Sequence, residues 1–154
     1  MSSREDAHLD RSSPSDRVAT GRLWRAALWS IAASSIAAIA AISLMVRLFS
    51  LPADFPPFHP VPVVLFIAVG VVGAAVALAV INRVSRRPFQ LFYMVAAVAL
   101  LISLVPNILL ASQADAVPVP GVSVGTMSAL GVLHAITAAI TVALFSSMAR
   151  EQRD

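Results

Sequence analysis

Long stretches without any charged side chain constrain this chain of 154 residues more than any other feature of its sequence. Four such stretches follow one another, and an arginine or an aspartate closes each of them: residues 26–46, 55–82, 88–114 and 116–149. A helix of about 20 apolar residues, rising about 1.5 Å per residue, crosses the apolar core of a bilayer. Each stretch is therefore long enough to form one membrane-spanning helix.

The composition excludes most classes of soluble protein. Only 12% of the residues are charged and 58% are hydrophobic, whereas soluble domains carry roughly 25% charged residues. A small soluble domain exposes a large share of its residues and needs a polar surface, which this sequence cannot provide. The stretches are apolar on nearly all faces, whereas helices of soluble bundles carry a polar stripe and membrane β-strands alternate. We therefore predict an all-α fold, a bundle of four transmembrane helices in up-down-up-down order.

Prolines and polar residues set the expected boundaries of these helices. Pro62 suits the first turn of the second helix, and Thr126 is the expected N-cap of the fourth. The helices are predicted at about residues 25–47, 62–83, 89–110 and 127–148. Because segment 1–21 is polar, we expect it to be a disordered cytoplasmic tail. Residues 22–149 are predicted to form the transmembrane domain, and residues 150–154 a short cytoplasmic tail.

Arginines are distributed unevenly between the two ends of the predicted helices. All 11 basic residues are arginines, and only Arg47 lies outside the N-terminal segment, the loop between the second and third helices, and the C-terminal tail. Because cytoplasmic loops carry an excess of basic residues, both termini are predicted in the cytoplasm. An even number of helices agrees with this prediction, since it places both termini on the same side of the membrane. No basic run interleaved with aromatic residues points to nucleic acid. The expected partners are the lipid bilayer and either a second copy of the chain or another membrane protein.

His134 is the ionisable residue that lies deepest in a predicted helix. It is seven residues from Met127, which places it about 10 Å below the outer end of the fourth helix. Ionisable groups at such depth face the bundle interior and often mark function. The structural alternative, a neutral imidazole bonded to a neighbouring helix, is favoured because no second ligand or acid–base partner lies nearby in the sequence.

Other polar residues lie at similar depths in the outer half of the bundle. Ser103 lies as far from the outer end of the third helix as His134 does in the antiparallel fourth, so we expect the two side chains to face each other. The predicted polar cluster contains Ser43, Arg47, Ser103, Asn107 and His134. Such a cluster suits a small ligand or a lipid headgroup. The alternative is hydrogen bonding between helices, with Arg47 reaching up to the membrane surface.

Small residues recur at helical spacing in three of the predicted helices. These stripes are Ala33, Ala37 and Ala41 in the first helix, Gly70, Ala74 and Ala77 in the second, and Gly131, Ala135 and Ala139 in the fourth. Small residues allow helices to approach closely in lipid, where packing drives their association. The stripes therefore predict helix packing, either within one chain or between two copies of it.

Several kinds of chemistry have no signature in the sequence. The chain contains no cysteine, and no predicted helix contains Asp, Glu or Lys, so a proton-coupled carboxylate of the kind used by small multidrug exporters is missing. No phosphate-binding glycine loop, Ser–His–Asp set or metal-ligand triad is recognisable. We therefore expect no enzymatic activity, no cofactor and no metal site.

Three short segments resemble a family of bacterial membrane proteins. They are Arg86-Arg87-Pro88 followed by Phe92, ALLISLVPNILL in the third helix, and GVLHAITAAI in the fourth. Together they are similar to a four-helix integral membrane family of the domain of unknown function 6069 type, over residues 23 to 148. Leu101, Ser103, Leu104, Pro106 and His134 match its pattern. The resemblance implies a four-pass fold in the bacterial inner membrane and implies no activity.

Three function classes follow from these observations. The leading one is a non-enzymatic membrane component, such as an accessory protein that binds a small ligand or lipid. The second is a small transporter or channel subunit that acts as an oligomer, which a continuous water-accessible polar path through the bundle would favour. The third is a membrane enzyme that uses His134, which the missing catalytic partners disfavour.

Overall fold

The computed structural model describes residues 20–114, 116 and 119–148, with the side chain of Thr20 left out. Four long helices account for most of this part of the chain: α1 (Thr20–Phe49), α2 (Pro60–Val84), α3 (Pro88–Ser112) and α4 (Val124–Met148). A short 3-10 helix, η2 (Pro56–Phe58), precedes α2. Each long helix is long and apolar enough to cross a membrane. The all-α fold with four such helices is therefore confirmed.

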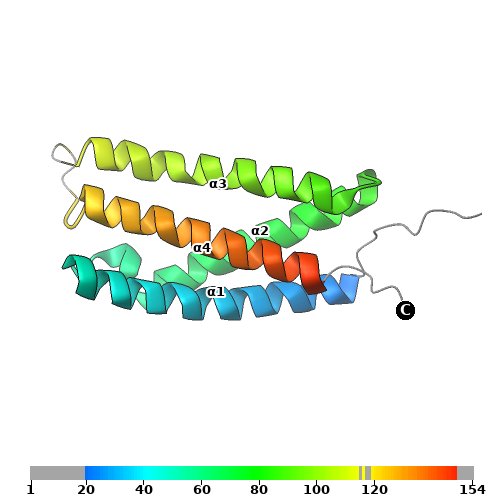
Figure 1. Ribbon diagram of the computed structural model, residues 1–154, viewed down its shortest axis with the longest axis horizontal. Helices are drawn as coiled ribbons and strands as arrows, with labels where there is room; N and C mark the ends of the chain where they lie inside the picture. The colour runs from blue at the N-terminus through cyan, green and yellow to red at the C-terminus, as the bar shows by residue number, and fades with distance from the viewer. Residues whose placement is uncertain (1–19, 115, 117–118, 149–154) are drawn as a thin grey trace, which may run out of the picture.

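Successive helices run in opposite directions, as the sequence predicts (Figure 1). The start of α1, the end of α2, the start of α3 and the end of α4 meet at one end of the bundle, which we call the inner end. The loop 50–59 and the described residues between α3 and α4, namely 113, 114, 116 and 119–123, lie at the opposite, outer end. The predicted tails, 1–21 and 150–154, lie outside the described residues, apart from residues 20 and 21, which belong to α1.

Prolines begin two of the helices, at positions where the missing backbone N–H costs nothing. Pro60 is the first residue of α2, two residues earlier than predicted, and Pro88 is the first residue of α3. At the end of α2, the Ser85 N–H donates to the Ile81 carbonyl oxygen at 2.9 Å. The Arg87 N–H in turn donates to the Ser85 hydroxyl at 3.1 Å. This pair of hydrogen bonds closes the short inner loop between α2 and α3.

The start of α4 differs from the prediction, because Ser123 rather than Thr126 precedes the helix. The Thr126 N–H donates to the Ser123 hydroxyl at 3.1 Å, and the Ser123 N–H donates to the Thr126 hydroxyl at 2.9 Å. This reciprocal pairing is a capping box in which threonine occupies the position usual for Glu or Gln. It satisfies two backbone donors of the first turn, so α4 begins at Val124 instead of Met127.

The helix α4 lies between α1 and α3, and α2 crosses behind them at an angle (Figure 1). The helix α4 packs along both α1 and α3, and α1 also packs against α2. Contact between α2 and α3 is less extensive. As a result, the fully buried residues of α3 are confined to its start: Pro88, Phe89 and Phe92. Among the described helices, α4 is the main packing partner of α3.

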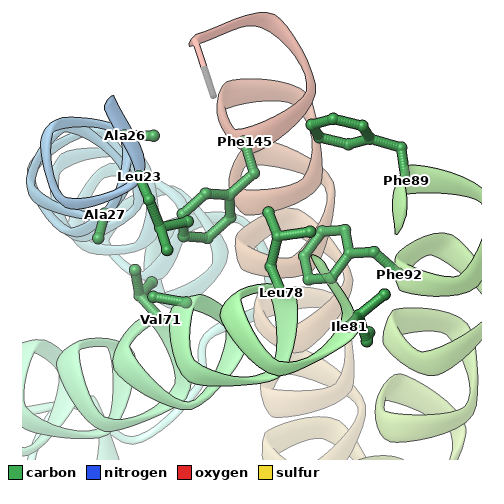
Figure 2. Packing of buried hydrophobic residues seen from close by; sticks show 10 residues of the cluster. Leu23, Ala26, Ala27, Val71, Leu78, Ile81, Phe89, Phe92 and Phe145 are labelled. Atoms are coloured by element: carbon green, nitrogen blue, oxygen red, sulfur yellow. The ribbon is translucent and has the colours of Figure 1, made fainter. Parts of the chain in front are cut away.

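The buried apolar residues form two clusters, one toward each end of the bundle. In the inner cluster, Leu78 of α2 and Phe92 of α3 point toward Phe145 of α4 (Figure 2). The rings of Phe92 and Phe145 meet edge to face, with their centres 5.9 Å apart. The outer cluster contains Phe55 and Phe58 of the outer loop, whose rings also meet edge to face. The loop 50–59 is thereby packed onto the outer end of the bundle.

A stripe of small residues allows α1 to pack closely against its neighbours. Buried residues recur every four positions along the helix: Ala26, Ser30, Ser34, Ala38 and Ile42. The predicted stripe at Ala33, Ala37 and Ala41 is only half-buried. On α2 and α4, three predicted stripe residues are exposed: Gly70, Ala135 and Ala139. The fully buried small residues of α1 are therefore not the ones that the spacing indicated, whereas Ala41 and Ala74 of the predicted stripes are half-buried and pack against the core clusters.

Candidate functional site

The structure divides the five residues of the predicted polar cluster into a pair on α1 and three residues on α3 and α4. Ser43 and Arg47 are exposed at the outer end of α1. Ser103 and Asn107 lie half-buried on α3, and His134 lies half-buried on α4. Because α4 lies between α1 and α3, the α1 pair and the α3 pair are on different sides of the central helix (Figure 1).

Within its own helix, each of three predicted cluster residues finds a hydrogen-bond partner. The Ser43 hydroxyl donates to the Ile39 carbonyl at 2.8 Å, and the Ser103 hydroxyl donates to the Leu100 carbonyl at 2.7 Å. His134 Nδ1 lies 2.7 Å from the Leu130 carbonyl oxygen. Since a carbonyl oxygen only accepts, Nδ1 carries the proton of this hydrogen bond. Across the described residues, no hydrogen bond joins His134 to Ser103 or Asn107.

The face of α3 that carries Ser103 and Asn107 does lie toward α4. A Cβ atom placed on Gly131 of α4 would lie 3.4 Å from Leu104 Cδ2, so this turn of α4 faces α3. Asn107 Nδ2 is buried there without a hydrogen-bond partner. Ser103, Asn107 and His134 therefore belong to neighbouring helix surfaces, and their polar atoms are not connected.

Two polar features were missed by the sequence reasoning. Ser30, Ser34 and Ser35 of α1 are buried, and their hydroxyl oxygens have no hydrogen-bond partner. The signal was available, since Ser30, Ser34 and Ser35 interrupt an apolar run over residues 26–42, with Ser30 and Ser34 four residues apart. Between α3 and α4, the Tyr93 hydroxyl donates to the Ser146 hydroxyl at 2.9 Å. Residues 53 positions apart make this bond, and no local pattern indicates such a pair.

A groove at the inner end of the bundle was also not predicted. It lies between the start of α1 and the end of α2 and has a volume of about 350 Å³. Its lining residues are Leu23, Trp24, Ala75, Val76, Ala79, Val80, Asn82 and Arg83. Apolar side chains line most of its length, and its polar residues lie in the last turn of α2. This combination of an apolar wall and few polar groups is typical of small-molecule sites.

Metal-binding or acid–base clusters do not occur in the part of the chain that the structure describes. No three residues among its His, Asp and Glu side chains are close enough to hold a metal ion. Asp54, in the outer loop, is the one described carboxylate. The groove is therefore the candidate site, because it combines an apolar lining with two polar residues, Asn82 and Arg83.

Comparison with known proteins adds no relative to this description. No family model matches the chain, and no curated protein or solved structure matches it. The class of the protein therefore comes from its own structure. Four apolar helices of bilayer length in an antiparallel bundle define a multi-pass membrane protein.

Proposed function

We propose that this protein is a non-enzymatic component of the bacterial inner membrane that binds a lipid-like ligand in the groove between α1 and α2. Both of its termini are placed in the cytoplasm in this proposal. The observation that carries it is the groove itself, an apolar cleft of about 350 Å³ with polar residues at one end. Membership of the bacterial four-helix family that the sequence resembles is part of the same proposal.

The distribution of arginines supports the proposed orientation. Five described arginines lie at the inner end of the bundle: Arg22, Arg25, Arg83, Arg86 and Arg87. Arg47 is the single described arginine at the outer end. Because basic residues are retained on the cytoplasmic side during insertion, the inner end is assigned to the cytoplasm. The groove then opens in the cytoplasmic leaflet of the bilayer.

The chemistry of the groove supports a lipid-like ligand. Leu23 and Ala75 form a buried apolar wall, and Val76 and Val80 are about half-exposed along the side of α2. Trp24, also half-exposed, lies in the first turns of α1, where tryptophan is typical of the membrane interface. A water-soluble ligand would leave its polar groups unpaired against this wall, whereas an alkyl chain needs only van der Waals contact.

Filling the groove tests this proposal. Ala79→Leu places a larger side chain in the groove, and Ala97→Leu makes the same change at an exposed position of α3. After extraction in a mild detergent, native mass spectrometry counts the lipids that remain on the full chain. We expect Ala79→Leu to lose a lipid that the wild type and Ala97→Leu retain. Equal lipid retention by all three proteins would contradict the proposal.

A further inference from the structure

We infer that the groove selects an anionic phospholipid of the cytoplasmic leaflet, whose phosphate binds Arg83 while an acyl chain lies along α2. This inference rests on the proposed function and adds the chemistry of the ligand. Three observations carry it: the order of side chains along the groove, the charge of the inner end, and the arginine at the groove mouth.

The order of side chains along the groove matches the order of groups in a phospholipid. Asn82 and Arg83 lie in the last turn of α2, while Ala75 and Val76 lie about two turns deeper. Seven residues separate Val76 from Arg83, which corresponds to about 10 Å along the helix axis at about 1.5 Å per residue. A ligand that is charged at one end and apolar over the next 10 Å fits this groove.

The charge of the inner end favours an anionic headgroup. The described residues at this end include five arginines and no carboxylate, since Asp54 lies in the outer loop. Arg83 is exposed and lines the groove mouth. Its guanidinium group can donate two parallel hydrogen bonds to a phosphate, a geometry that lysine does not provide. A zwitterionic lipid would bring an additional positive group to an end that is already positive.

A specific site must be distinguished from the general attraction of basic residues for an anionic membrane surface. Arg86 provides the matched control, because it is also exposed at the inner end but does not line the groove. The substitutions Arg83→Gln and Arg86→Gln remove the same charge. Only Arg83→Gln removes a donor from the groove mouth.

The experiment uses the full chain in detergent and adds phosphatidylglycerol or phosphatidylcholine with the same acyl chains. Native mass spectrometry counts the bound lipid, and thermal unfolding measures the stabilisation that each lipid provides. We expect preferential binding of one phosphatidylglycerol, which Arg83→Gln weakens about tenfold, as the loss of a charge-assisted hydrogen bond predicts. Arg86→Gln should change binding less than about twofold. Arg83→Lys, with its single ammonium group, should bind more weakly than the wild type and more tightly than Arg83→Gln.

Three results would overturn the inference. Equal weakening by Arg83→Gln and Arg86→Gln would indicate general surface attraction. Equal binding of the two lipids by the wild type would remove the anionic selectivity, although the proposed function would stand if Ala79→Leu still displaced a lipid. The third result involves the acidic residues that precede α1, Glu5, Asp6, Asp10 and Asp16. In this result the wild type binds neither lipid, and a variant with these four acidic residues changed to Gln or Asn binds phosphatidylglycerol. The occupant of the groove would then be the chain's own N-terminal segment.

Discussion

Truncating Phe145 is expected to weaken the inner end of the bundle more than any exposed substitution of the same size. Phe145 is fully buried on α4, and its ring meets that of Phe92 edge to face. The substitution Phe145→Leu removes the aromatic pair and leaves a small cavity against Leu78 (Figure 2). The same change at Phe66, which is 73% exposed on α2, removes no packed contact and serves as the control.

The magnitude follows from what a membrane protein loses when a core side chain is truncated. In water, Phe→Ala in a core costs about 3–5 kcal/mol, and a large part of that is transfer from water to an apolar interior. In a bilayer the unfolded helices remain in an apolar medium, so packing is the main loss. The aromatic pair contributes about 0.5–1.5 kcal/mol, and a cavity of about 20 Å³ adds about 0.5 kcal/mol at roughly 24 cal/mol per Å³. We therefore expect Phe145→Leu to cost about 1–2 kcal/mol.

Reversible unfolding in mixed micelles, followed by circular dichroism, measures this difference. A double-mutant cycle with Phe92→Leu isolates the aromatic pair, and its expected coupling is about 0.5–1.5 kcal/mol. Phe66→Leu should stay within about 0.5 kcal/mol of the wild type. Strict additivity of Phe92→Leu and Phe145→Leu, or an equal cost for Phe66→Leu, would refute the packing described for the inner cluster.

The remaining predictions concern the outer loop, the contacts between α3 and α4, and the orientation. Gly121 has φ of +82°, and a Cβ there would lie 2.8 Å from Phe55 Cδ2, so Gly121→Ala should lower the free energy of unfolding by about 1–3 kcal/mol. Gly73 has open space around it, so Gly73→Ala should lose no stability. Equal stability of the two variants would contradict the contact between Gly121 and Phe55. Tyr93→Phe and Ser146→Ala should be coupled by about 0.6 kcal/mol and at most about 1.7, because the two hydroxyls share a hydrogen bond. Ser103→Ala and His134→Ala should be additive, because Ser103 and His134 each bond to a carbonyl of their own helix. Unfolding of the single and double variants measures both couplings, and a larger coupling for the second pair would disprove this assignment. In intact cells, a membrane-impermeant maleimide should label Ala116→Cys in the outer loop and not Ser85→Cys in the inner loop. The reverse pattern would overturn the proposed orientation. Equal labelling of the two variants would contradict the four-pass arrangement.

The sequence alone was sufficient to predict the number, approximate span and alternation of the four helices. A bilayer imposes a minimum apolar length and excludes charge from it, so the charged residues between the uncharged stretches are enough to divide the chain. Charged and proline-rich boundaries are recognised from neighbouring residues alone, and for this reason most helix ends were predicted to within two or three residues. Two helices begin earlier than predicted: α1 at Thr20, five residues before the expected start, and α4 at Val124, three residues early because Ser123 pairs with Thr126.

Only the tertiary structure decided which face of each helix is buried. In water, a polar stripe marks the exposed face, but in lipid the exposed face is as apolar as the core, so this periodic signal is lost. The burial of Ser30 and Ser34 in place of Ala33 and Ala37 follows from how α1 meets α2 and α4. The crossing of α2 behind the other helices likewise brings Arg83 and Trp24 to the lining of one groove, although they lie 59 positions apart in the sequence. Such a site depends on the angle at which two apolar helices cross, and that angle is set by side-chain packing across the interface rather than by the pattern of either helix.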